Sequence, residues 1–160
     1  MDINFLALLI AAIIPILIGF IWYNPRVFGN IWMNEIGLNK DNMKPFNVAK
    51  VFLLSFVYAF LISFVLQMLV IHQFGAIGMV GGDPSIAKPS YAAFMADYGT
   101  AFRSFKHGAL HGCMTGLFMI LPVTGTGALY EQRSFRYVLV SSGFWIVSFT
   151  IMGGIICMMQ

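Results

Sequence analysis

Four long apolar runs, almost free of charged side chains, constrain this chain more than any other feature. They cover residues 3–23, 51–72, 107–130 and 137–159 of the 160-residue sequence. A helix needs about 20 apolar residues to cross the hydrocarbon core of a bilayer, and each run reaches this length. We therefore predict one all-α domain over residues 1–160, in which four transmembrane helices form an antiparallel bundle.

The composition supports a membrane protein and excludes several other classes. Charged residues make up 9% of the chain and hydrophobic residues 59%, whereas a soluble domain carries about 25% charged residues. Such a chain is too apolar for a disordered or nucleic-acid-binding protein. The sequence contains no glycine-rich phosphate loop, nucleophile elbow or zinc-protease motif. It therefore predicts no catalytic residue, and a non-enzymatic protein is favoured.

The distribution of positive charge predicts an orientation in the membrane. The first and third connections contain six cations and the second contains three: Arg26, Lys40, Lys44, Lys50, Arg133 and Arg136 against Lys88, Arg103 and Lys106. The positive-inside rule then places the first and third connections in the cytoplasm and both termini outside. The first run follows Asp2 and has no small-residue cleavage site, so we interpret it as a retained span.

The two long connections each predict a short interfacial helix. In the first, Val27, Phe28, Ile31, Trp32 and Ile36 recur at helical spacing, and Gly37 is the expected end of that helix. The second begins with a glycine-rich, flexible stretch over residues 75–84. Aromatic residues then follow helical spacing from Tyr91 to Phe105. This second helix is expected to lie in the outer headgroups, with a lid over the bundle as the alternative.

Small residues in the third run predict a helix-packing face. Gly108, Gly112 and Gly116 are spaced by four residues, a GxxxG pattern that lets a second helix approach the backbone closely. The partner is either another span of the same chain or a second copy of the protein. The candidates for the facing surface on the fourth run are Gly143, Gly153 and Gly154.

Three histidines are the candidate ligands of a metal. His107 and His111 project from one side of the third run, and His72 leaves the outer end of the second. Imidazole nitrogens in this arrangement can bind zinc, copper or haem iron. No Asp or Glu lies within any of the four runs to support them. Hydrogen bonding between helices is therefore the favoured interpretation, and Cys113 and Cys157 are expected to be free thiols.

The end of the first run resembles a known family. Trp22-Tyr23-Asn24-Pro25, followed by Phe28-Gly29 and Trp32, is similar to the signature of a small bacterial membrane-protein family catalogued as domain of unknown function seventeen sixty-one. The second half agrees at His111-Gly112, Pro122, Leu129-Tyr130-Glu131-Gln132-Arg133 and Met152-Gly153-Gly154. The resemblance implies a four-helix protein of the bacterial inner membrane with no assigned activity or cofactor. The resemblance also singles out the residues where the first run ends as a feature worth testing. They form either a structural corner or a docking surface for another membrane protein: Trp22, Tyr23, Pro25, Phe28, Gly29 and Trp32.

Four functions are compatible with these features, of which the last is a membrane-embedded enzyme that would need a polar cluster of Tyr58, Gln67, Thr115 and His111. The leading hypothesis is an accessory or packing subunit without cofactor, which self-associates or joins a larger membrane complex through the glycine face and the aromatic corner. The second is binding of a metal ion or haem by His72, His107 and His111. The third is a carrier of a small solute that uses Tyr58, Gln67 and helix bends at Pro15 and Pro122.

Overall fold

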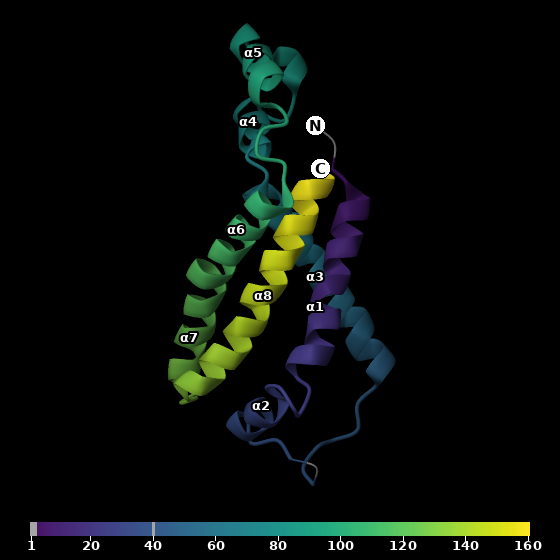
Figure 1. Ribbon diagram of the computed structural model, residues 1–160, viewed down its shortest axis with the longest axis vertical. Coiled ribbons are helices and arrows are strands. Elements are labelled where there is room, and N and C mark those ends of the chain that lie inside the picture. The colour runs from purple at the N-terminus through teal and green to yellow at the C-terminus, as the bar shows by residue number, and fades with distance from the viewer. Residues whose placement is uncertain (1–2, 40) are drawn as a thin grey trace.

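The computed structural model describes residues 3–39 and 41–160, and it confirms the all-α fold (Figure 1). Within these residues, four helices are long and apolar enough to cross a membrane. They are α1 (Phe5–Trp22), α3 (Val48–Val70), the continuous helix of α6 (Phe105–Thr115), η2 (Gly116–Ile120) and α7 (Leu121–Tyr130), and α8 (Phe135–Met159). Asp2 and Lys40, which entered the arguments on cleavage and orientation, lie outside the described residues.

Three of these helices begin two or three residues before the apolar runs, because a polar side chain caps each of them. The caps are Asn47 before α3, Ser104 before α6 and Ser134 before α8, which accept hydrogen bonds from the N–H groups of Lys50, His107 and Tyr137. A capping oxygen satisfies one N–H group of the first turn, which has no partner within the helix. The first turns therefore include polar residues that hydropathy alone leaves outside the span.

The third membrane helix contains a π-helical turn directly before a proline. In η2 the N–H of Leu121 donates to the carbonyl of Gly116, five residues back. Pro122 has no N–H to donate, so a regular α-helix would lose a hydrogen bond here. The irregularity predicted near Pro122 is thus a wider turn that precedes it.

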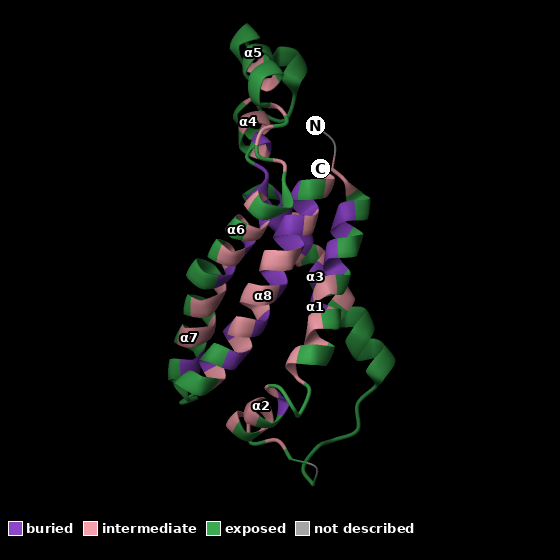
Figure 2. Cartoon of the chain, in the orientation of Figure 1, coloured by how far each residue is buried: buried purple, intermediate pink, exposed green. Residues whose placement is uncertain are grey.

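α8 is the central helix of the bundle. It lies between α1 on one side and α6 with α7 on the other (Figure 1). Buried residues follow it along most of its length (Figure 2). The main apolar core joins α1, α3 and α8 and contains Leu8, Ala11, Leu66, Val70, Ile71, Phe149, Met152, Ile156 and Cys157. The contacts of α8 with α1 on one side and with α6 and α7 on the other therefore position the segments at both ends of the bundle.

The first connection contains the predicted short helix, α2 (Gly29–Glu35). Gly37 follows it with a φ of 70°, a left-handed conformation that glycine adopts at no steric cost. The side chain of Ser134 donates to the Glu35 carboxylate, and the Arg133 guanidinium donates to the Glu35 carbonyl at 3.1 Å. These contacts fasten α2 to the turn between α7 and α8.

The second connection differs from its prediction in two ways. Its glycine-rich beginning is partly helical, as α4 (Gln73–Met79), and is followed by η1 (Pro84–Ile86). The predicted helix over residues 91–105 ends early, as α5 (Pro89–Tyr98). Phe102 has a φ of 63°, which no right-handed helix accommodates. α4 and α5 project beyond the end of the bundle, and α5 is largely exposed (Figures 1 and 2).

Candidate metal centre

The structure brings together all three histidines that the sequence offers as metal ligands. His72 precedes α4, and His107 and His111 lie one turn apart on α6. One ring nitrogen of each lies within 4.8 Å of those of the other two. The Nε2 atoms of His72 and His107 are 3.0 Å apart, which is hydrogen-bonding distance. The ring centroids of His107 and His111 are 4.5 Å apart, and those of His72 and His111 are 4.9 Å apart.

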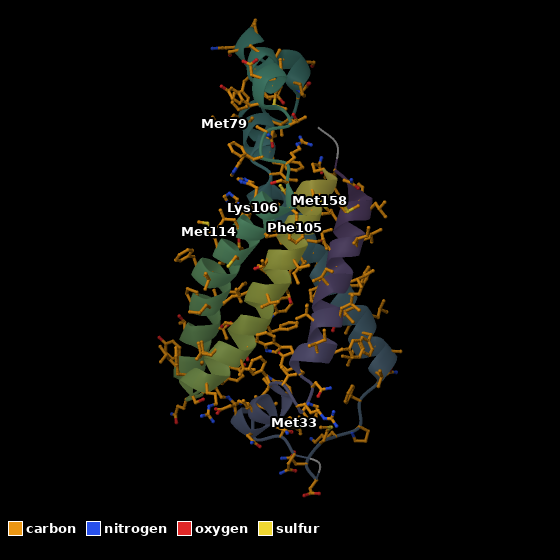
Figure 3. The ribbon with its side chains drawn as sticks, viewed as in Figure 1. Met33, Met79, Phe105, Lys106, Met114 and Met158 are labelled. Atoms are coloured by element: carbon orange, nitrogen blue, oxygen red, sulfur yellow. The ribbon has the colours of Figure 1, made fainter. Side chains whose placement is uncertain are left out.

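Two local features of the fold produce this arrangement. α3 ends at Val70, and the extended, buried Ile71 carries the chain to His72 at the surface. Ser104 starts α6 so that His107 falls in its first turn, next to the exposed Lys106 (Figure 3). The cluster therefore lies at the end of the bundle from which α4 and α5 project.

Phe102 is a residue of this site that the sequence analysis missed. Its ring stacks on His107 with a centroid distance of 5.0 Å, and it meets the edge of His72 at 6.2 Å. Its carbonyl accepts hydrogen bonds from the Ser104 N–H and from the Cys157 thiol. A left-handed backbone is unusual for a bulky residue and costs about 1–3 kcal/mol. The sequence gives no sign of it, because helical spacing assigned Phe102 to an amphipathic stripe.

Gln73 is the second residue that the sequence analysis missed. It is buried, and its amide donates to the carbonyls of Tyr98 and Ala101 at 2.7 and 3.0 Å. These bonds tie the start of α4 to the turn that follows α5. The only sequence signal is an amide directly after His72 in an otherwise apolar stretch.

The histidine cluster is open on two sides. A recess of about 210 Å³ reaches His72 between Phe94, Tyr98 and Phe102. A second recess, of about 500 Å³, reaches His107 on the other side of α6 and is also lined by Lys106 and Cys113. His72 is exposed and the other two histidines are partly buried. The exposed ring of His72 is therefore accessible to solvent.

Neither the cysteines nor the acidic residues contribute a further ligand to the histidine cluster in the part of the chain that the structure describes. Cys113 and Cys157 are free thiols, as expected. Glu131, at the opposite end, pairs with Arg133 at 3.6 Å. Of the residues considered for a solute path, Gln67 is buried, whereas Tyr58 is 60% exposed.

The predicted packing glycines lie between α6 and α8. All three are buried, and a Cβ atom at Gly108 or Gly112 would collide with the backbone of Gly153 or Phe149. At Gly116 it would collide with Ile146. Of the candidates for the facing surface, Gly153 meets Gly108, whereas Gly143 and Gly154 face the rings of Trp22 and Phe105. The glycine face is therefore covered by α8 of the same chain.

The residues of the predicted corner pack against one another where α1 meets α2. Trp22 contacts Phe28 with a ring distance of 4.5 Å, and its indole N–H donates to the Val140 carbonyl at 3.0 Å. Tyr23 contacts Trp32 and also Phe144 of α8. Pro25 is exposed in the turn, and a Cβ at Gly29 would collide with the Tyr23 carbonyl.

Burial, with a smaller contribution from Tyr137, raises the pKa of Tyr23 from 10.0 to about 12. The phenol at this corner therefore keeps its proton through the physiological range.

Comparison with known proteins identifies a family but no activity. No curated protein and no solved structure matches the chain. The family described as "Protein of unknown function (DUF1761)" matches residues 6–157, which include the three histidines, the packing glycines and the aromatic corner. The chain therefore belongs to the DUF1761 family.

Proposed function

We propose that this protein binds a transition-metal ion through His72, His107 and His111 at the surface of the membrane. The observation that carries the proposal is the approach of three ligand nitrogens to within 4.8 Å of one another. Zinc–nitrogen bonds are about 2.0–2.1 Å long, so nitrogens around one tetrahedral ion lie roughly 3.3 Å apart. The 3.0 Å separation of His72 and His107 is already near this value, and a ring nitrogen of His111 lies within 4.8 Å of both.

The chemistry of the donors limits the class of ion. Three neutral imidazoles suit zinc, copper, nickel and cobalt rather than calcium or magnesium, which prefer oxygen ligands. Because no carboxylate joins the group within residues 3–39 and 41–160, a divalent ion would keep its full charge there. Three protein ligands also leave a fourth tetrahedral position for water or an anion.

The packing of the rings favours an ion over haem. The three pairs of ring centroids are 4.5–5.0 Å apart, so the imidazoles already touch one another. A porphyrin ring would have to pass between two of them to be held by both.

The surroundings of the site support exchange of the ion rather than permanent retention. Ligating histidines usually donate their second ring N–H to a carboxylate or carbonyl, and loss of such a partner lowers affinity about 10–100-fold. Within the described part of the chain, no such acceptor contacts these rings. With the orientation predicted from charge, the site faces the outside, and the protein would capture or pass on ions there.

Metal titration of the purified protein tests this proposal. The protein is prepared with an affinity tag that contains no histidine, stripped with chelator, and titrated with Co²⁺ while the visible absorption of the ion is followed. We expect one Co²⁺ per chain, displaced by Zn²⁺. His111→Ala and His72→Gln should each weaken binding by about tenfold or more, because each removes one ligand.

Lys106→Gln and Cys113→Ser are the matched controls, because both residues lie beside His107 but do not belong to the ligand group. They should bind Co²⁺ like the wild type. Absence of stoichiometric binding, or equal binding by His111→Ala and the wild type, would refute the proposal.

The glycine face does not favour self-association as a second candidate. α8 of the same chain covers Gly108, Gly112 and Gly116, so this face is not available to another copy. An accessory role would then rest on the aromatic corner, the second surface expected for it.

A further inference from the structure

α1 and α3 pack closely over only one half of their length. The buried residues of α1 are Ala7, Leu8, Ala11, Ala12 and Pro15, of which the first four lie in its first half and Pro15 lies just past its middle. Those of α3 are Ala59 at its midpoint and Ser63, Leu66, Gln67 and Val70 in its second half. Because the helices are antiparallel, these halves lie at the same end of the bundle. Ser63 donates to the Leu8 carbonyl at 3.2 Å, so the two backbones nearly touch there.

At the other end, a groove separates the same two helices. The first eight residues of α3, from Val48 to Ser55, are all exposed (Figure 2). The groove between them has a volume of about 430 Å³, and its wall on the bundle side is formed by Phe144 and Trp145 of α8. Small-ligand sites have volumes of roughly 300–1,000 Å³. The groove therefore has the size of a binding site, although it is far from the histidines.

The length of the groove matches one leaflet of a bilayer. It extends along α1 from Pro15, in the middle of the helix, to Tyr23 at its end. Eight residues of helix span about 12 Å. One leaflet contributes about half of the 30 Å hydrocarbon core. A single hydrocarbon chain that enters from the headgroup level can therefore fill the groove.

The cross-section of the groove excludes a helix. Phe20 of α1 and Phe52 of α3 stack with ring centroids 5.5 Å apart. Both rings line the groove and both are exposed, so they bridge it on its lipid side. A helix with side chains is about 10 Å wide and does not fit beneath such a bridge. A flexible acyl chain does.

Charged and polar groups gather at the headgroup end. Lys50 directly precedes Val51 of the groove, and Arg26 lies three residues after Tyr23. Both cations are exposed, and neither has a carboxylate partner among the residues that the structure describes. The protonated phenol of Tyr23 can donate to a phosphate or ester oxygen. These groups favour an anionic headgroup, because cations at the membrane surface attract anionic lipids.

We infer that this groove holds one acyl chain of an anionic phospholipid, whose headgroup lies beside Lys50 and Arg26. The lipid occupies the space between α1 and α3 that their large side chains hold open. It is a second site, distinct from the histidine cluster at the opposite end of the bundle.

Native mass spectrometry of the protein in mild detergent tests the inference. We expect one anionic phospholipid per chain to survive purification. Ser55→Phe places a ring in the groove from α3 and should lower retention about tenfold or more, because an overfilled cavity excludes its ligand. Gly19→Leu fills the groove from α1, where an added Cβ meets only the Phe144 ring at 3.8 Å. Two variants on different helices guard against misfolding of one.

Leu53→Phe is the matched control, because Leu53 is 64% exposed and does not line the groove. It should retain lipid like the wild type. Lys50→Gln should keep a lipid but lower the preference for anionic over zwitterionic headgroups about fivefold.

Three results would overturn the inference. One is the absence of retained lipid, and another is equal retention by Ser55→Phe, Gly19→Leu and Leu53→Phe. The third is a disulfide between two copies of Ser55→Cys, because it would show that a second protein chain covers the groove.

Discussion

The two ends of the bundle differ in how closely their helices pack. At the histidine end, small residues such as Ala11, Ser63 and Gly112 let neighbouring backbones approach. At the α2 end, α1 and α3 meet through the rings of Phe20 and Phe52, which hold the helices apart. Lipid supplies no hydrophobic force between helices, so side-chain size sets their distance. One end can thus hold polar ligand groups in contact, and the other can admit a hydrocarbon chain.

The largest expected effect comes from adding one methyl group to the contact between α6 and α8. Gly112→Ala places a Cβ against the Phe149 carbonyl, so the helices must separate, and the free energy of unfolding should fall by about 3 kcal/mol. Gly127→Ala lies in the same continuous helix with no atom within 4 Å of the added Cβ. It should gain up to about 1 kcal/mol from helix propensity. Unfolding in detergent measures both, and equal stabilities would contradict the comparison.

A second pair of variants compares the two ends along α3. Ser63 is fully buried against α1, so Ser63→Leu should lower the free energy of unfolding by about 2 kcal/mol. Ser55 faces the groove, so Ser55→Leu should change it by less than about 0.5 kcal/mol. Denaturant titration of both proteins gives the difference. If Ser55→Leu proved as destabilising as Ser63→Leu, the groove end would be packed as tightly as the histidine end.

The smallest effect is a pH dependence at the corner beside the groove. The pKa of Tyr23 rises from 10.0 to about 12 on folding, so the folded state holds this proton more tightly than the unfolded state. Stability from Tyr23 is complete below pH 10 and is lost as the pH rises from 10 to 12. Tyr23→Phe should remove this loss, which is roughly 1 kcal/mol because solvent partly screens the phenol.

Melting temperatures measured between pH 8 and pH 12 test this prediction, since that interval contains both values of the Tyr23 pKa. Tyr130→Phe, which removes a phenol that is 87% exposed, is the control. The assignment to Tyr23 would be wrong if both variants lost stability in parallel with the wild type.

Hydropathy alone was sufficient to predict the membrane helices, because a bilayer demands about 20 apolar residues in a row. It was insufficient for their ends, where Asn47, Ser104 and Ser134 extend the helices into polar sequence. The second connection was harder still. Helical spacing continued from Tyr91 to Phe105, but the left-handed conformation of Phe102 interrupts it, and tertiary contacts determine that conformation.

The candidate site was predictable in part. The spacing of His107 and His111 places them on one side of a helix, whatever the rest of the fold does. The approach of His72 depends on α3 ending beside the start of α6, and no local pattern encodes that. Phe102 and Gln73 surround the site through contacts between distant segments, so sequence spacing could not reveal them.

By itself, the sequence determined that the chain is suited to a membrane, how many helices can span it, and which glycines share one helix face. These features follow from the length of the apolar runs and from residue spacing along one helix. Only the tertiary structure decided that the glycine face is covered by α8 of the same chain, that three histidines meet, and that α1 and α3 separate to leave a groove. These outcomes depend on which side chains meet between helices. That is a property of pairs of segments, and a pattern within one segment cannot specify it.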